Sequence, residues 1–311
     1  MLKAIGLIGV LSLALAGLAS AQPSPATSGP GAAPPPGGMP RGYRDPSEGH
    51  KRVLFVGDVQ TGVSTAHDWS VSHAAAVLER LGRETGAYDL YIRSDEGLIT
   101  KGKTYGSGSY GPGSLHPAVG RNLDYFDAVV FYTNGPLQMT DAQEHDLLAF
   151  VHDDGKGFVG IHTATATLTQ FPQYADMIGA HFDNHPWGIT TAPIIVEDPK
   201  WAAMARFKTG MPLTDEFYQM SDPYKRGDVD VLMRLDTRSL DLTNKMVHRT
   251  DGDFPMAWTK TYGKGRVFYS PLGHPVAAWD DPRIQTMYLE AIKWALGETG
   301  GEPHPHPMSP P

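Results

Sequence analysis

The order of the apolar segments constrains the fold of this chain more than any other feature. Between residues 51 and 297, short apolar runs rich in β-branched residues alternate with segments of helical periodicity. Short apolar strands that alternate with helices are typical of a parallel sheet covered by helices on both faces. The sequence therefore predicts one α/β domain over residues 51–297, with a doubly wound, mostly parallel sheet and added strands. The expected strands are 53–56, 88–92, 128–132, 158–161, 194–196, 231–235, 256–259 and 266–269, and the expected helices are 70–81, 141–152 and 282–296.

Two segments inside this domain lack a clear strand or helix pattern. Residues 181–224 read as a loop-rich stretch, with one short strand near 194–196. Residues 94–122 are rich in Gly, Ser and Tyr and show little periodicity. Because loops of this length are usually functional or disordered, we expect 94–122 to form a lid or rim over the site.

The first 21 residues are typical of a secretory signal peptide. Lys3 is followed by an apolar run over residues 4–18 and by the small residues Ala19-Ser20-Ala21. The apolar run is shorter than the roughly 20 residues that span a bilayer. We therefore expect cleavage after Ala21 and a secreted or periplasmic protein without a membrane anchor.

Low-complexity segments flank the predicted domain. Residues 22–50 consist largely of Pro, Gly, Ala and Ser, and residues 298–311 are similarly poor in apolar side chains. Such compositions cannot bury enough apolar surface to fold. We expect a disordered leader over 22–50 and a flexible tail over 298–311.

Cysteine usage and charge exclude several classes of function. The 311 residues contain no cysteine, so the chain has neither a disulfide nor a thiol nucleophile. The formal net charge is −8, and no run of Lys or Arg interrupts the acidic balance. Nucleic acid and anionic membranes are therefore poor candidate partners, and a small neutral ligand fits better.

His162 stands where a predicted buried strand ends. In Gly160-Ile161-His162-Thr163-Ala164, small residues lie two positions before and two positions after the histidine. Sharp strand-to-helix turns of this form present a catalytic side chain above the sheet, and a bulky residue at either flanking position would crowd the turn. We interpret His162 as a functional residue and not as a histidine that only hydrogen-bonds a neighbouring carbonyl.

Three later histidines are further candidates. His274 comes just after the last predicted strand, and ligands in open α/β sheets lie beyond the carboxyl ends of strands. His181 and His185 have the spacing of a helical metal pair, but Pro186 and a preceding glycine favour a loop. Of these two we prefer His185 as a site residue, with an ordinary loop histidine as the alternative.

A carboxylate, a fourth histidine and aromatic rings complete the candidates. Asp215 and Glu216 are adjacent, so on a strand only one of them can face a crevice, and surface solvation is the alternative for both. His67 follows the first strand and could reach the same edge of the sheet and contact substrate there, or could mark a helix N-terminus. Aromatic rings beside the polar candidates could bind a sugar by stacking, although such rings are more often structural. These rings belong to Trp69, Trp187, Tyr218 and Trp279.

Several short segments, taken in order, resemble the ThuA-like, trehalose-utilisation family. The strongest is the pattern GRVFY...LGH over residues 265–274, and the resemblance covers about residues 52–297. It implies the flavodoxin-like fold of class I glutamine amidotransferases, with His162 in place of their nucleophilic cysteine and His274 near their triad histidine. Because the chain has no cysteine, glutaminase chemistry is excluded. The other matching segments are 162–164, 181–186, 215–218, 255–258 and 293–297.

The resemblance implies a role in the metabolism of trehalose or related, including oxidised (keto), disaccharides, and a divalent metal in some members. A His-rich site with one carboxylate suits Zn, Mn or Fe. We expect His162, His185 and His274 to bind such a metal or to act directly as acid and base. Glu216 is expected to move a proton in an isomerisation, hydration or elimination. The alternative is a non-catalytic exported sugar-binding domain, which needs the aromatic rings and not the imidazoles.

Overall fold

The computed structural model describes residue 47 and residues 49–58, 67–105 and 119–308. All of these residues belong to one compact unit. The predicted signal peptide at 1–21, nearly all of the predicted leader at 22–50 and the middle of the 94–122 segment lie outside the described residues. No described helix is both long enough and apolar enough to cross a membrane.

A central sheet of nine strands organises the domain, in the order β2-β1-β5-β6-β13-β12-β11-β8-β9. Neighbouring strands are parallel from β2 to β13 and antiparallel from β13 to β9. The predicted doubly wound, mostly parallel sheet with added strands is thus confirmed. The strands are β1 (Arg52–Val56), β2 (Asp89–Arg93), β5 (Ala128–Phe131), β6 (Gly157–Ile161), β8 (Ile189–Val196), β9 (Pro212–Glu216), β11 (Asp230–Leu235), β12 (Pro255–Tyr262) and β13 (Gly265–Ser270).

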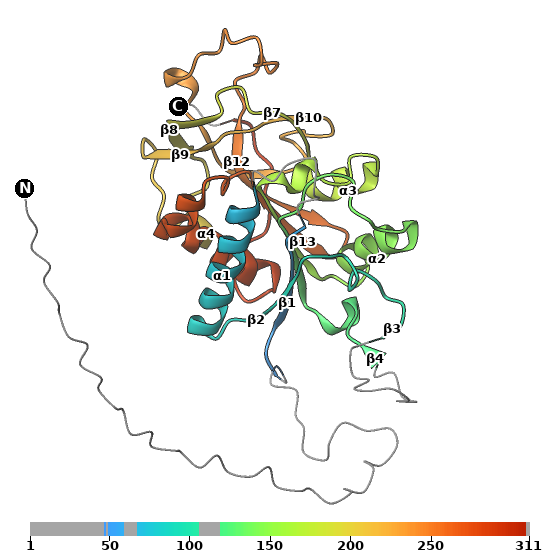
Figure 1. Cartoon of the computed structure of the whole chain (residues 1–311). Helices are drawn as coiled ribbons and strands as arrows, with labels where there is room; N and C mark the ends of the chain where they lie inside the picture. The colour runs from blue at the N-terminus through green and yellow to red at the C-terminus, as the bar shows by residue number, and fades with distance from the viewer. Residues whose placement is uncertain (1–46, 48, 59–66, 106–118, 309–311) are drawn as a thin grey trace, which may run out of the picture. The chain divides into compact units, whose positions relative to one another are not determined.

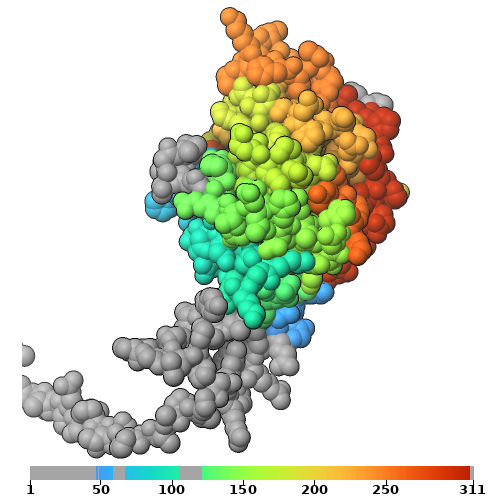
Figure 2. Space-filling view, turned by 90° about the vertical axis from the view of Figure 1, so that its right-hand side faces the viewer, coloured from blue at the N-terminus to red at the C-terminus, as the bar shows by residue number. Residues whose placement is uncertain are grey.

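Helices cover both faces of this sheet (Figure 1). On one face α1 (Asp68–Thr85) packs beside α4 (Pro282–Ala295), and on the other α2 (Asp141–His152) packs beside α3 (Pro172–Ile178). Figure 2 shows the second face, with the α2 and α3 region in green. In β1, Val53 and Phe55 join the core under α1 and α4, while Leu54 joins the core under α2 and α3. Because both faces of the strand are buried, the strand is apolar throughout.

The 181–224 stretch contains more regular structure than the sequence predicts. It holds β7 (His181–Asn184), β10 (Gln219–Ser221), the full length of β8, and β9. β7 pairs with β10, and β8 pairs with β11 and β9. These antiparallel strands are partly exposed and carry Thr, Asp and Pro, so they lack the continuous apolar run of a buried strand. Their pairing with distant segments stabilises them.

The remaining elements are short. β3 (Thr104–Tyr105) and β4 (Val119–Gly120) form a small antiparallel pair on either side of residues 106–118. Short 3₁₀ turns connect the larger elements: η2 (Leu123–Tyr125), η3 (His162–Ala166), η4 (Ala202–Met204), η5 (Thr237–Ser239) and η6 (Val276–Asp280).

The described part of the predicted tail, residues 298–308, has no helix or strand but contacts the domain. Trp294 donates its ring N–H to the carbonyl of Gly301, and the backbone N–H of His304 donates to the carboxylate of Asp230. These bonds hold the segment against the closing helix and β11.

A candidate metal centre

The turn at the end of β6 raises His162 out of the sheet. His162 begins η3 with φ at +46°, in the left-handed region, where a residue other than glycine costs about 1–3 kcal/mol. A Cβ atom on Gly160 would lie 2.8 Å from Cδ1 of Ile178 and 3.3 Å from Cβ of Ala164. A side chain at position 160 would therefore crowd Ile178 and Ala164, which is the physical reason for the glycine before His162.

The hydrogen bonds of His162 determine which ring nitrogen is available. Its Nδ1 lies 2.6 Å from the carbonyl oxygen of Pro271, which can only accept, so Nδ1 carries the proton and donates it. Nε2 therefore has the lone pair, and the Tyr218 hydroxyl donates to it at 2.8 Å. Burial, together with the neighbouring His67, lowers the pKa of His162 well below its usual value. His162 is a neutral imidazole with an accepting Nε2.

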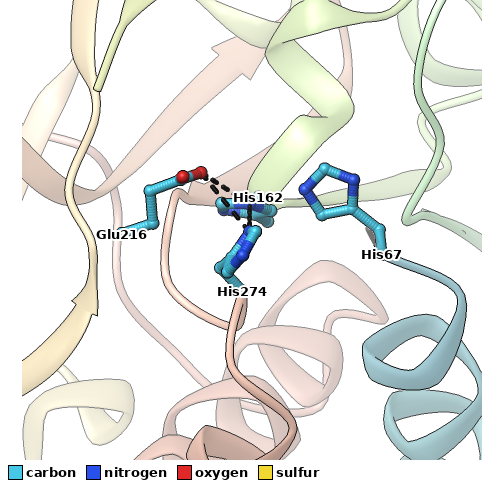
Figure 3. Close-up of side chains that lie close together, drawn as sticks. All are labelled: His67, His162, Glu216 and His274. Atoms are coloured by element: carbon cyan, nitrogen blue, oxygen red, sulfur yellow. Dashed lines mark hydrogen bonds and ion pairs between the residues drawn. The ribbon is translucent and has the colours of Figure 1, made fainter. Parts of the chain in front are cut away.

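His274 and Glu216 converge on that nitrogen (Figure 3). Nδ1 of His274 lies 3.0 Å from Nε2 of His162 and 3.4 Å from Oε2 of Glu216. The same carboxylate oxygen lies 3.6 Å from Nε2 of His162. Burial lowers the pKa of His274, although the charge of Glu216 acts in the opposite direction. Two imidazoles and one carboxylate thus face each other beyond the carboxyl ends of β6 and β13.

His67 approaches the same point from the start of α1 (Figure 3). Its ring centroid lies 5.1 Å from that of His162 and 4.8 Å from that of His274. Burial, followed by the charges of His274 and His185, lowers the pKa of His67 to about 4. The site therefore keeps its imidazoles in the neutral form that binds metal ions.

These side chains form a group suited to a metal ion. One ligand atom from each lies within 4.8 Å of the ligand atoms of the other three. Within the residues that the structure describes, no other cluster of His, Cys, Asp or Glu has this geometry. Three neutral imidazoles and one carboxylate are a donor set for Zn, Mn or Fe(II). The four members of this group, called the metal centre below, are His67, His162, Glu216 and His274.

Of the predicted metal ligands His162, His185 and His274, the metal centre contains His162 and His274, together with Glu216 and His67. His162 and His274 are brought together as expected, with Glu216 beside them. His185 lies at the rim with its side chain 42% exposed, and its Nδ1 is 3.7 Å from Oε1 of Glu216. His67, expected to contact substrate, takes the place of His185 in the group.

Asp215 supports the loop that carries His274, a role that the sequence analysis did not assign to it. Its buried carboxylate accepts the backbone N–H groups of Gly273 at 2.8 Å and of His274 at 3.0 Å. Strand alternation holds, since Glu216 faces the histidines and Asp215 faces the loop that carries His274. Neither acid is solvated, however, and burial raises the pKa of Asp215 to about 7. The signal in the sequence was the adjacency of the two acids, Asp215 and Glu216, both of which are buried in the structure.

The four aromatic candidates do not form one platform. Tyr218 lies in the site, with its ring centroid 4.5 Å from that of His162. Trp279 is fully buried and donates to the carbonyl of Gly273, so it supports the His274 loop and has no surface for a sugar. Trp187 packs against Phe254. Trp69 is 79% exposed on the first turn of α1.

Comparisons with known proteins agree with this fold. The family model for trehalose utilisation, ThuA, matches residues 114–295. A ThuA-like protein of Bacteroides uniformis ATCC 8492 is 19% identical with a TM-score of 0.60, over 83% of this chain and 95% of that one. A ThuA-like protein of Parabacteroides merdae ATCC 43184 is 18% identical with a TM-score of 0.56, over 81% of this chain and 92% of that one. These likenesses show a shared fold. No curated protein matches the chain.

Proposed function

Because the chain belongs to the ThuA family of trehalose utilisation, whose model matches more than half of its length, we propose that it is an exported, metal-dependent enzyme acting on trehalose-like or oxidised (keto) sugars. The observation that carries this proposal is the convergence of three neutral imidazoles and one carboxylate in the metal centre. Fold alone assigns no reaction, so the argument rests on these side chains.

The donor set favours a divalent ion over an empty cluster. Burial lowers the pKa values of His67, His162 and His274, and in His67 and His162 the neighbouring imidazoles lower them further, so the three rings are neutral. A cation that replaced the Tyr218 hydroxyl at Nε2 of His162 would gain three nitrogen ligands, and the carboxylate of Glu216 would offset part of its charge. A bound divalent ion supplies Lewis-acid polarisation of a carbonyl or hydroxyl oxygen on the sugar.

We assign the proton transfer in such a reaction to Glu216 and His185. One carboxylate oxygen of Glu216 faces His162 and His274, while the other faces Nδ1 of His185 at 3.7 Å. The His185 ring is partly exposed at the rim, where substrate and water have access. Imidazole exchanges protons near neutral pH, as an isomerisation, hydration or elimination of a sugar requires.

Metal analysis of the purified mature protein tests the proposal. We expect close to one equivalent of Zn, Mn or Fe in the wild type, and at least a tenfold loss in His162→Ala. His152→Ala is the matched control, because it removes an exposed imidazole on α2. His185→Ala should retain the metal but lose turnover of oxidised trehalose. A wild type without metal, with sugar turnover insensitive to His162→Ala, would refute the proposal.

The same variants address the non-catalytic alternative. A sugar-binding domain that does not use the imidazoles should bind trehalose almost equally well in the wild type, in His162→Ala and in His274→Ala. Export is tested separately, by N-terminal sequencing of the protein recovered outside the cytoplasm. Processing after Ala21 would give a mature chain that begins at Gln22.

A further inference from the structure

A groove lies beside the metal centre, between the β8–β9 pair and the η6 turn. Its cavity has a volume of about 400 Å³, within the range of small-molecule sites. The face of β8 and β9 forms one wall, and the segment from Pro275 to the start of α4 forms the other. The lining residues that matter here are Ile189, Thr191, Thr214, Pro275, Asp281 and Arg283.

Strand register places this groove next to the metal centre. In the β8–β9 pair, Thr191 lies opposite Thr214, and Ile189 lies opposite Glu216. Because side chains alternate along a strand, Thr214 and Glu216 point to the same face. On the other wall, Pro275 directly follows His274. The lining residues Thr214 and Pro275 are therefore two positions from Glu216 and one position from His274, respectively.

The groove offers hydroxyl groups and apolar surface. The Oγ1 atoms of Thr191 and Thr214 are 2.7 Å apart, and whichever of them donates, the pair retains one O–H donor and accepting lone pairs for a ligand. Ile189 is 55% exposed and supplies apolar contact area beside Pro275.

Charge in the groove is balanced within the protein. The guanidinium of Arg283 donates to the carboxylate of Asp281 through Nε and Nη2, and Nη1 donates to the carbonyl of Pro212. An ion pair that is already satisfied gives no preference for a charged ligand. A neutral ring with hydroxyl edges and CH faces complements this surface.

We propose that the groove binds the second sugar unit of a disaccharide whose first unit lies at the metal centre. The proposal rests on the proposed function, from which it takes the substrate class, and it adds that the protein selects disaccharides over monosaccharides. Thr191 and Thr214 hydrogen-bond the second unit, and Ile189 and Pro275 pack against it. The reacting atoms lie at the other end, beside Glu216.

Filling the groove tests this assignment. Thr214→Trp places a large ring on the wall of the groove that β8 and β9 form, and tryptophan is well tolerated in strands. Thr261→Trp is the matched control, since Thr261 is an exposed threonine on β12. It pairs with Arg266 near the start of β13, at the end of the strands that lies away from the metal centre. Binding of trehalose and of glucose is measured by calorimetry on each mature protein, with metal content determined in parallel. Thr191→Trp, on the same face, replaces Thr214→Trp if the latter does not fold.

We expect Thr214→Trp to weaken trehalose binding at least tenfold, with glucose affinity and metal content unchanged and with Thr261→Trp behaving as wild type. Equal trehalose affinity in Thr214→Trp and Thr261→Trp would overturn the assignment, as would an equal loss for trehalose and glucose or a wild type that binds neither. If the wild type holds no metal but still binds trehalose, and Thr214→Trp loses that binding, the groove assignment stands and the proposed metal-dependent function is refuted.

Discussion

Asp215 fixes the position of His274 by accepting its backbone N–H at 3.0 Å, while the other carboxylate oxygen accepts Gly273. In Asp215→Asn the amide nitrogen would face one of these N–H groups and leave it unpaired, at a cost of about 1–3 kcal/mol. The looser His274 should lower metal affinity about 10- to 100-fold, as expected for residues that orient ligands. Urea unfolding and metal competition measure the two effects. Unchanged metal affinity in a folded Asp215→Asn protein would show that Asp215 does not position the ligand.

The tight turn before His162 predicts a steric effect at Gly160. In Gly160→Ala the new Cβ would lie 2.8 Å from Cδ1 of Ile178, so the core must shift, and we expect a loss of about 1–3 kcal/mol in the free energy of unfolding. Gly227→Ala is the control, because a Cβ there meets no atom within 4 Å. Urea denaturation of both variants gives the comparison. Equal stability of the two would contradict the crowded turn.

Glu96 predicts a stability change with pH away from the metal centre. Burial, together with the neighbouring Asp58, raises the pKa of Glu96 from 4.5 to about 7. The folded state therefore binds more protons than the unfolded state between these values, and the contribution of Glu96 to stability is lost as pH rises through about 7. We expect Glu96→Gln to be more stable than the wild type above pH 7 and to differ little near pH 4.5. Unfolding free energies across this range provide the test, and a constant difference would count against it.

Metal removal should lower stability through binding linkage. A ligand present at 100 times its dissociation constant stabilises the folded state by about 2.7 kcal/mol. We therefore expect a chelator to lower the melting temperature of the wild type, and Zn or Mn to restore it. His162→Ala should show neither response. A melting temperature that is the same with chelator and with added metal would indicate that the four ligand atoms hold no ion.

Local patterns in the sequence were sufficient to predict the parallel half of the sheet. Strands such as β1 and β6 are buried on both faces, so their apolar runs carry the information. The antiparallel half was harder to predict, because β8 owes its length to pairing with β9 and β11, which are distant in sequence. The half-exposed residues of β8, such as Thr191, resemble those of a loop.

The candidate site was predictable to a similar extent. The small residues around His162 revealed the turn, and the end of β13 located His274. The position of His67 in the metal centre could not be predicted from a local pattern, because it depends on a contact between residues far apart in the sequence. The Ser70 hydroxyl donates to the carbonyl of His274 and joins the first turn of α1 to the His274 loop. His185 follows Asn184, the last residue of β7, and its side chain is 42% exposed at the rim.

The ligands of the metal centre are spread from His67 to His274, on four segments that meet only when the sheet is complete. An unfolded chain cannot bring these four ligands together, so an ion could bind only after the domain has folded. A chain that crosses a membrane unfolded would acquire its ion only on the far side. The ion that it carries would then be decided by the metals of its destination and not by those of the compartment in which it was synthesised.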